Sequence, residues 1–358
     1  MKATQKLYDM GQSIWLDNLT RGLLNSGTLG RYIQEFSVTG LTSNLANLEC
    51  AIREGNEYDR AFELLPTPPP GAEEQFTALA LEDVKEGADL LRPVFELTDG
   101  VDGWVSLELS PLLANDTAGA VAEARRMHEM ANRPNVYIKI PGTKAGLPAV
   151  EEAIFLGIPV NVTLLYSREQ YLAASEAYLR GQLRRLDAGL KPDVSSVASV
   201  AIGQWDVATS GRLPAHLRHQ LGIAIAGRAY AAYRALIDSP RCQQVIEAGG
   251  RTQRLLWTET GIKEPASGDL LYIKALAAPF TVNAMPEAAL TALADHGDLG
   301  GILSTNGAHG EEVIANVAKA GISVLSLAAR LQDEGLKAQI KTWHELMACI
   351  TEKGAAVI

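Results

Sequence analysis

The sequence predicts a (β/α)8 TIM barrel with extra helices, as a single domain over residues 1–358. Alanine-, leucine- and charge-rich segments with helical spacing, such as 116–132 and 168–189, separate most of a series of short β-rich runs. A strand followed by a helix, repeated along one chain, predicts parallel strands joined by right-handed crossovers and closed into a barrel. The eight runs begin near Ser13, Val38, Trp104, Val136, Pro159, Ser195, Arg254 and Thr281.

Two segments are longer than the alternation of one strand and one helix requires. The stretch from Asn44 to Trp104 is too long for one helix, so we expect a helical insertion around 55–98, with a rigid proline-rich turn, LPTPPPGAEE, inside it. The region around 298–358 is predicted to form helices that cover the barrel. No composition change marks a linker, which favours one domain.

The composition indicates a globular protein with a small-molecule substrate. The chain is 47% hydrophobic, and its net charge of −10 argues against binding to nucleic acid or to an anionic membrane. No apolar run approaches the roughly 20 residues that span a bilayer, and the first ten residues lack the apolar stretch of a signal peptide. We therefore expect a cytoplasmic protein.

The metal-binding residue types give no ligand pattern. Cys50, Cys242 and Cys349 are far apart, which predicts reduced thiols rather than a disulfide framework or a zinc site. The histidines lie in predicted helices and loops away from the strand ends. Metal catalysis is therefore the weaker alternative, and no metal is expected.

The fourth β-rich run, VYIKIP, places a lysine between two isoleucines. Side chains alternate across a strand, so Val136, Ile138 and Ile140 should face the helices while Tyr137 and Lys139 face the barrel interior. The same alternation sends polar side chains inward from the other runs. Predicted inward residues are Ser13, Trp15, Asp17, Thr42, Asn44, Ser106, Glu108, Asn161 and Thr163; predicted outward residues are Ile14, Leu16, Val105, Leu107, Leu109, Val160, Val162 and Leu164.

These inward polar groups meet where barrel enzymes carry their active sites, at the C-terminal ends of the strands. Burial lowers the pKa of a lysine, and the neutral amine is a nucleophile for a carbonyl carbon. Lys139 is therefore a candidate for Schiff-base chemistry. The alternative is a structural role in which Lys139 is ion-paired to Glu108 or Asp17.

The residues around these positions resemble the transaldolase family, of the longer bacterial type. Seven blocks occur in the family's order: SIWLDNLTR, VTGLTSN, WVSLELSPLLANDT, YIKIPGTKAGLPAV, GIPVNVTLLYS, SVAS and TVNAMPEAAL. The resemblance implies a barrel enzyme that needs no cofactor and forms a Schiff base through Lys139. It also implies roles for several neighbours: Asp17 as the acid/base, Glu108 with Thr163 as the pair that handles a catalytic water, and Asn44, Asn161 and Ser199 as substrate-binding residues. Thr42, an inward residue at the end of the same strand as Asn44, is a further candidate for substrate binding.

The sequence departs from the family pattern where members bind phosphate. Gln204 stands where an arginine is usual, and Glu259 where a serine is usual. Lys263 remains in the family's loop position, where it is a candidate substrate-binding residue with Gln204, Glu259 and Ala201; the alternative is that it only neutralises Glu259. Ala201 replaces a usual aromatic residue, and Leu45 a usual proline.

Two interpretations of these changes stay open. Phosphate binding could be rebuilt from neighbours such as Arg168 or Arg254, or the substrate could be unphosphorylated, bulkier or cationic. The resemblance implies transfer of a three-carbon dihydroxyacetone-type unit between a ketose and an aldehyde, and simple aldol cleavage is a variant of it. A non-catalytic binding protein with this fold is the alternative from another class. The expected partner is a small sugar or sugar-phosphate-like molecule, and the chain is expected to be a monomer or a homodimer.

Overall fold

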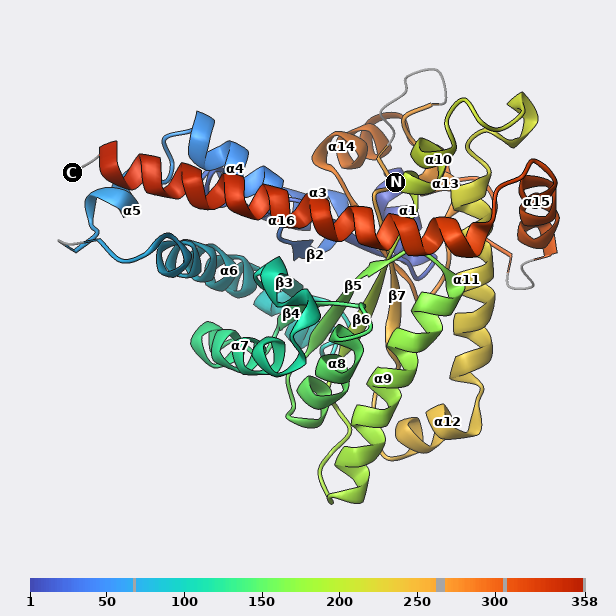
Figure 1. The fold of residues 1–358 in the computed structure, drawn as a ribbon, viewed down its shortest axis with the longest axis horizontal. Helices are drawn as coiled ribbons and strands as arrows, with labels where there is room; N and C mark the ends of the chain where they lie inside the picture. The colour runs from blue at the N-terminus through green and yellow to red at the C-terminus, as the bar shows by residue number, and fades with distance from the viewer. Residues whose placement is uncertain (67–68, 262–267, 305–307, 357–358) are drawn as a thin grey trace.

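The computed structural model confirms the predicted barrel (Figure 1). Every strand is parallel to its neighbours, each pairs with the next in sequence, and the first pairs with the last. The structure describes residues 1–66, 69–261, 268–304 and 308–356. The strands are β1 (Ser13–Leu16), β2 (Val38–Thr42), β3 (Trp104–Glu108), β4 (Val136–Pro141), β5 (Val160–Leu165), β6 (Ser196–Ala201), β7 (Arg254–Thr258) and β8 (Val282–Met285), one for each of the eight predicted runs.

Helices connect the strands and surround the barrel. The first half of the chain contributes α1 (Ala3–Asp9), α2 (Arg21–Asn25), α3 (Thr28–Phe36), α4 (Leu45–Glu54), α5 (Asp59–Glu63), α6 (Ala72–Leu97), the 3-10 turn η1 (Pro111–Asn115), α7 (Thr117–Ala131) and α8 (Gly146–Phe155). The second half contributes α9 (Arg168–Asp187), α10 (Gly203–Thr209), η2 (Ala215–Leu217), α11 (Leu221–Ile237), α12 (Pro240–Glu247), α13 (Leu271–Ala275), α14 (Glu287–His296), α15 (Ala308–Lys319) and α16 (Val324–Ala356).

Side-chain caps explain where several of these helices begin. The Ser167 hydroxyl accepts a hydrogen bond from the backbone N–H of Gln170 while the Gln170 side chain bonds back, which is a capping box at the start of α9. Asp116 caps α7 through the N–H of Gly119, and Asn44 caps α4. These caps place the first turns of α4 and α9 directly after β2 and β5, beside the mouth of the barrel.

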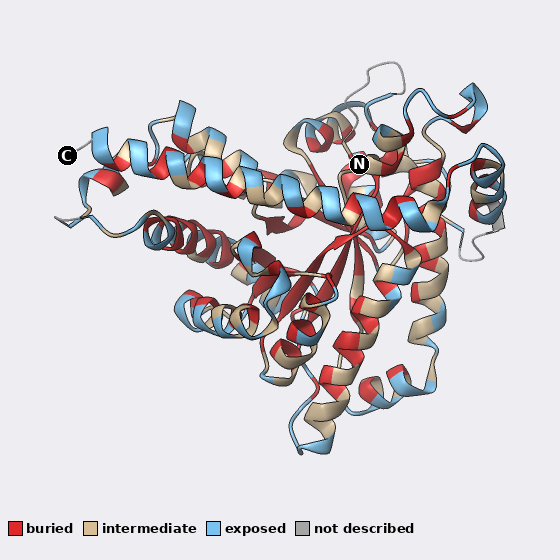
Figure 2. Ribbon diagram, in the orientation of Figure 1, coloured by how far each residue is buried: buried red, intermediate tan, exposed pale blue. Residues whose placement is uncertain are grey.

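The alternation predicted for the fourth strand is present. Val136, Ile138 and Ile140 belong to the apolar core between strands and helices, and all three are fully buried. Figure 2 shows this layer as buried strands and buried inner helix faces, with the exposed residues on the outer faces. The core therefore lies outside the barrel wall, and Lys139 projects to the other side of that wall.

Aromatic rings fill the lower half of the barrel. Trp104 and Tyr137 stack with ring centroids 4.1 Å apart, and Trp15 stacks on Tyr137 at 6.0 Å. Gly40 leaves room for the Trp15 ring, because a Cβ at this position would overlap it. The packed rings close the interior below the layer of Lys139.

One predicted orientation was wrong. Leu164 was expected to face the helices, but it borders the cavity at the mouth of the barrel, and Leu165 takes the outward place in the core. The cause is a bulge: Leu164 has a positive φ of 57°, and the pairing of β5 with β6 shifts between Val162 and Leu165. Beyond the bulge the alternation of the strand is reversed.

Helix α16 crosses the mouth of the barrel. Figure 1 shows this long red helix running from the side of α11 and α15 to the side of α4 and α5. It packs on α4 and α6, and the side-chain amide of Gln332 donates to the backbone carbonyls of Gly142 and Leu164 at 3.0 and 2.9 Å. Because those carbonyls follow β4 and lie in β5, α16 is fastened directly to the strand ends.

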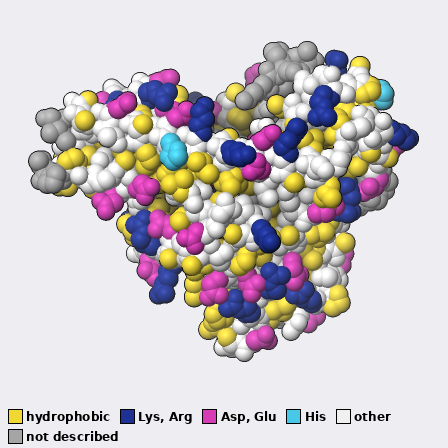
Figure 3. Space-filling model, in the orientation of Figure 1, with side chains coloured by type: hydrophobic (Ala, Val, Ile, Leu, Met, Phe, Trp, Pro, Cys, Tyr) yellow, Lys and Arg dark blue, Asp and Glu magenta, His cyan; other side chains and the backbone are white. Residues whose placement is uncertain are grey.

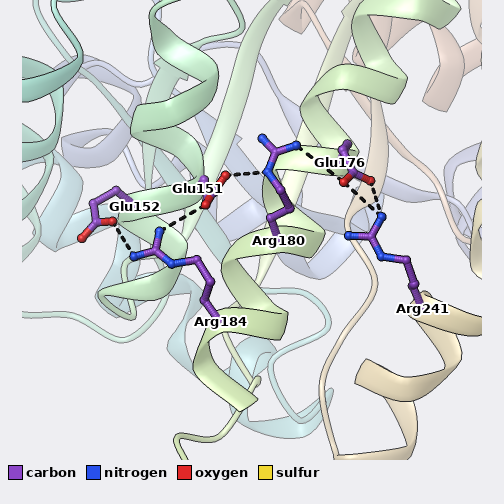
Figure 4. A network of polar contacts seen from close by, with 6 residues as sticks. All are labelled: Glu151, Glu152, Glu176, Arg180, Arg184 and Arg241. Atoms are coloured by element: carbon purple, nitrogen blue, oxygen red, sulfur yellow. Dashed lines mark hydrogen bonds and ion pairs between the residues drawn. The ribbon is translucent and has the colours of Figure 1, made fainter. Parts of the chain in front are cut away.

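The outer surface carries mixed charge. On the face drawn in Figure 3, basic and acidic side chains are interspersed. Figure 4 shows one network in which Arg180 and Arg184 of α9 bind Glu151 of α8 at 2.6 and 3.2 Å, and Glu176 binds Arg241 of α12. Arg180 and Arg184 are 43% and 39% exposed, so each pair adds about 1 kcal/mol or less to stability.

None of the single helices in the described part of the chain is long and apolar enough to cross a bilayer. The segments Gly310–Lys319 and Val324–Ala356 satisfy that length and hydropathy only when taken together, across a bend of 91°.

Candidate active site

A cavity of about 660 Å³ opens at the C-terminal ends of the strands, under α16. A larger cavity of about 810 Å³ lies at the opposite end, against Ser13, Tyr137 and Arg254, and contains none of the predicted site residues. The stacked aromatic rings separate the two. The predicted site residues that line the upper cavity are Asp17, Thr42, Asn44, Glu108, Lys139, Thr163, Ser199, Ala201, Gln204 and Glu259.

Lys139 lies in the wall of this cavity, on β4. Its Nζ is 2.7 Å from Oε2 of Glu108 and also donates to the backbone carbonyl of Ser43. Both charged side chains are largely buried, with 10% and 11% of their surface exposed. The ion pair expected for a structural lysine is therefore present, yet the same amine borders a cavity large enough for a sugar.

The pairing of β3 with β4 fixes this contact. Glu108 and Lys139 are directly opposite each other in the ladder, and both are inward residues of their strands. Ser43, which follows β2, holds both: its hydroxyl accepts from the backbone N–H of Glu108 at 3.1 Å, and its carbonyl accepts from Lys139. Ser43 was not among the predicted site residues, although it stands inside the quoted VTGLTSN block.

Asp17 follows β1 and faces the same cavity. Burial raises the pKa of its carboxyl above the usual value, and the positive charge of Lys139 and a hydrogen bond from Asn44 oppose that rise. Its backbone is held on both sides: the N–H donates to Met285 and the carbonyl accepts from the Asn47 side chain at 3.0 Å. A carboxyl that is held in place, and whose pKa is raised, is suited to accept and return a proton.

Asn161 is not among the residues that line the cavity. The Ser199 hydroxyl donates to Asn161 Oδ1 at 2.6 Å, and Asn161 Nδ2 donates to the Ser106 hydroxyl at 3.1 Å. Asn161 is 1% exposed. Its amide therefore links β3 to β6 through Ser106 and Ser199, and Asn161 is in register with Lys139 across β4 and β5.

The wall opposite the catalytic candidates comes from the ends of β5, β6 and β7. Ala201 ends β6, Gln204 lies in the first turn of α10, and Glu259 follows β7 with a positive φ of 56°. Thr42 and Thr163, at the ends of β2 and β5, complete the rim. Lys263 lies outside the described residues.

Sequence reasoning missed the contribution of α16 and of the residue after β5. Tyr166 borders the cavity and is 3% exposed. The α16 residues follow a helical spacing of small and medium side chains, a signal that was available in the sequence but does not say which surface the helix covers. The α16 residues in the cavity wall are Leu331, Glu334, Gly335, Ala338, Gln339 and Thr342.

The described residues that line the cavity carry more carboxyl groups than amines. Among its described lining residues, the carboxylates of Asp17, Glu108, Glu259 and Glu334 face the single ammonium of Lys139, and no arginine is present. Neither alternative arginine restores a cation. Arg254 lies at the other end of the barrel, bound to Asp102 at 3.1 Å, and Arg168 is paired with Glu169 outside the cavity wall. The interpretation in which Arg254 rebuilds an anion site was therefore wrong.

The described residues contain no cluster of three or more His, Cys, Asp or Glu side chains placed to hold a metal ion. The reactive groups of the cavity are one amine, several carboxyls and the hydroxyl and amide groups around them. Such a set can add an amine to a carbonyl and move protons.

Comparison with known proteins agrees with the expected family. The family model described as Transaldolase/Fructose-6-phosphate aldolase matches residues 14–350. Similar proteins include a transaldolase of Thermobifida fusca, 40% identical with 98% of each chain covered, and transaldolase 1 of Streptomyces coelicolor, 40% identical with 98% of this chain and 94% of the relative covered. A transaldolase of Thiobacillus denitrificans is 38% identical over 98% of this chain and 100% of its own. The chain therefore belongs to the transaldolase/fructose-6-phosphate aldolase family.

Proposed function

We propose that this protein is a transaldolase-type enzyme that carries a three-carbon dihydroxyacetone-type unit as a Schiff base on Lys139. The observation that carries the proposal is the position of the Lys139 amine, which borders the cavity 2.7 Å from Glu108 with Asp17 in the same wall. Family membership and the transaldolase names of full-length relatives support the reaction class.

The first step joins the sugar to the protein. Lys139 passes a proton to the Glu108 carboxylate, and the free amine adds to the ketose C2 carbonyl to give a carbinolamine. Glu108, through a water held with Thr163, then protonates the departing C2 oxygen, which leaves as water, and a protonated Schiff base remains. The close contact between Glu108 and Lys139 supports this proton exchange.

The second step breaks a carbon–carbon bond. Asp17 takes the proton of the C4 hydroxyl, the C3–C4 bonding electrons move into the Schiff base to form an enamine, and an aldehyde leaves. In transfer, the enamine attacks a second aldehyde and Asp17 returns the proton to the new hydroxyl. In simple cleavage, the enamine takes up a proton and water releases the ketone, so the two outcomes differ only in what discharges the enamine.

The proposed substrate is unphosphorylated at the end that meets Gln204 and Glu259. A phosphate dianion needs charge-assisted donors, and each such hydrogen bond is worth roughly 1.5–3 kcal/mol. The described wall offers carboxylates and an amide there instead. The Glu259 carboxylate would repel a phosphate dianion, but it would not repel a sugar that ends in a free hydroxyl or a cationic group.

Reductive trapping tests the lysine. Incubation with dihydroxyacetone and borohydride, followed by intact-mass measurement, should give one adduct on the wild-type protein and none on Lys139→Ala. Lys144→Ala is the matched control, because Lys144 is a nearby exposed lysine in the same block of sequence and should leave the adduct unchanged. Absence of an adduct with dihydroxyacetone and with a panel of ketoses would favour the non-catalytic binding protein.

A comparison of substrates tests the part of the cavity where Gln204 and Glu259 replace the residues usual in the family. Fructose and fructose 6-phosphate should be cleaved with a clear preference for the free sugar. A catalytic efficiency with fructose 6-phosphate equal to or above that with fructose would remove this part of the proposal and leave the lysine chemistry standing.

A further inference from the structure

The cavity at the N-terminal end of the barrel, the lower cavity, lies outside the proposed reaction. It does not border Lys139, Glu108 or Asp17, and active sites of this fold lie at the other end, where the strands finish. Its volume of about 810 Å³ falls in the range of about 300–1,000 Å³ that is usual for small-molecule sites. The lower cavity is therefore large enough for a ligand that the chemistry at Lys139 does not use.

Aromatic and aliphatic side chains form much of its wall. Tyr137, which stacks on Trp104 inside the barrel, borders the cavity from β4. Tyr233 and Ile237 of α11 border it from the helical layer. Rings and branched side chains in a wall favour a ligand with a flat, apolar body.

Phe280 adds a ring that is both exposed and strained. The residue is 58% exposed, and its φ of 65° lies in the left-handed region that a bulky side chain rarely adopts. Two hydrogen bonds hold it there: its N–H donates to the carbonyl of Gly11 at 2.8 Å, and its carbonyl accepts from the hydroxyl of Tyr233 at 3.0 Å. Backbone strain of this kind is found where the surrounding structure over-determines it, often at ligand sites.

The described residues that line the lower cavity carry one more cation than carboxylates. The cations are the guanidinium groups of Arg234, Arg251 and Arg254, and the carboxylates are those of Asp9 and Asp102. The upper cavity has the opposite balance, with one ammonium and four carboxyls among its described residues. One excess positive charge fits a ligand with a single negative charge.

Arg254 is already engaged by the protein. Its guanidinium donates to Asp102 at 3.1 Å, to the hydroxyl of Ser13 at 2.6 Å and to the backbone carbonyls of Val101 and Thr281 at 3.0 and 3.1 Å. This arginine therefore holds the wall together and is not the one that we expect to bind a ligand.

Arg234 is differently placed. Its guanidinium lies over the ring of Phe280, with Cζ 5.2 Å from the ring centroid, and it forms none of the ion pairs found in the described part of the chain. Arg251 is intermediate, because it donates to the backbone carbonyl and the carboxylate of Asp99, a side chain that is fully exposed. An exposed pair of that kind is weak. The cation most open to an anion is thus Arg234, beside an aromatic ring.

We propose that the lower cavity binds an aromatic carboxylate, with the carboxylate on Arg234 and the aromatic body beside Phe280 and Tyr233. A guanidinium binds a carboxylate through two parallel hydrogen bonds and also stacks on aromatic rings. Arg234 and Phe280 supply both kinds of contact at one place. This site is separate from the sugar site and does not depend on the reaction proposed at Lys139.

Isothermal titration calorimetry with naphthalene-2-carboxylate tests the site. The acid should bind the wild-type protein at a single site. Naphthalene-2-carboxamide has the same shape without the charge and should bind at least tenfold more weakly, and 2-naphthylmethylammonium should bind more weakly still. Equal affinity for the acid and the amide, or no binding of the acid, would overturn the proposal.

Two variants divide the contacts. Arg234→Gln should weaken binding of the acid about 10- to 100-fold, the value of one charge-assisted hydrogen bond, and leave the amide unchanged. Phe280→Gly removes the ring and suits the positive φ, so it should weaken both probes roughly twofold to tenfold while the Tm stays at or above that of the wild type. Arg241→Gln is the matched control and should bind as the wild type does, because Arg241 is 50% exposed, pairs with Glu176 and does not line the cavity.

Lys139→Ala locates the probe. The upper cavity also contains an amine, and a carboxylate bound there would depend on it. Because the stacked rings separate the two cavities, Lys139→Ala should bind naphthalene-2-carboxylate with wild-type affinity. Loss of binding in Lys139→Ala, or wild-type affinity in Arg234→Gln, would refute a site at the N-terminal end of the barrel.

Discussion

The ammonium of Lys139 lies 2.7 Å from the carboxylate of Glu108 on the neighbouring strand, and both side chains border the same cavity. An ion pair buried only for stability has no need of a cavity beside it. Here the pair borders one, which is the arrangement that the proposed proton transfer from the amine to the carboxylate requires when a carbonyl compound binds.

Glu108→Gln should slow Schiff-base formation strongly. A positioned acid/base group typically contributes about 100- to 10,000-fold, and the amide cannot take the proton of Lys139. The rate of adduct formation with dihydroxyacetone and borohydride measures the effect. Glu151→Gln is the control, because it removes one carboxylate from the partly exposed network of Figure 4, away from the cavity. A wild-type rate in Glu108→Gln would show that another group accepts the proton.

Asp17→Asn should separate attachment from bond cleavage. The variant keeps Lys139 and Glu108, so it should still form the dihydroxyacetone adduct, but cleavage of a six-carbon ketose should fall by about 100-fold or more because no base takes the C4 proton. In the wild type, cleavage should decline as the pH falls through the raised pKa of Asp17, at a pH above the usual range for aspartate. Equal loss of both activities would contradict this division of roles.

The same variant should change stability in a pH-dependent way. Because burial raises the pKa of Asp17, the folded protein binds this proton more tightly than the unfolded chain does, and the resulting stability is present at low pH and lost as the pH rises through the folded-state pKa. Asparagine has no such dependence. The Tm of Asp17→Asn minus that of the wild type should therefore grow from acidic to neutral pH in thermal unfolding. A difference that shrinks over this range would refute the assignment.

Gln204→Arg should improve the use of a phosphorylated sugar. Gln204 lines the cavity at the start of α10, where a guanidinium can offer paired donors to a phosphate. One charge-assisted hydrogen bond of roughly 1.5–3 kcal/mol corresponds to a decrease in KM for fructose 6-phosphate of about 10- to 100-fold. Gln204→Lys is a useful companion, because it adds charge without the planar fork and should give a smaller gain. No change in either variant would mean that the sugar end does not lie at this position.

Gly335→Ala should weaken the attachment of α16. A Cβ at Gly335 would overlap the Tyr166 hydroxyl, so the helix or the buried ring has to shift, at a typical cost of about 1–3 kcal/mol. Urea unfolding measures the loss. Adding Tyr166→Phe to Gly335→Ala should recover part of the lost stability, because the overlapping hydroxyl is then absent. Gly321→Ala cannot serve as the control, because Gly321 has a positive φ of 81° and alanine would be strained there. Equal loss in the single and double variants would contradict the contact.

The fold was predictable because each strand carries its own signal. The alternation of Val136, Ile138 and Ile140 with Tyr137 and Lys139 is local, and it fixes which face of β4 is buried. The alternation failed at Leu164, where a bulge set by the pairing of β5 with β6 reverses the pattern. A single strand carries no information about such a shift in pairing.

The site was predictable to the extent that it is built from strand ends. Asp17, Glu108 and Lys139 share one cavity because parallel strands end at the same edge of the barrel. The absence of Asn161 from the cavity lining could not be predicted from its strand position alone, because its side chain is held by bonds to Ser106 and Ser199. The wall from α16 was missed because long-range contacts, such as Gln332 with the Leu164 carbonyl, decide where that helix docks.

The path of α16 over the barrel has a consequence for the biosynthesis of the protein. All eight strands leave the ribosome before this helix does, and domains begin to fold as they are synthesised. The Lys139 amine and the carboxyls of Asp17 and Glu108 can thus come together before α16 covers the mouth of the barrel. The cavity wall is therefore completed last, when Glu334 and Gly335 of α16 take their places in it.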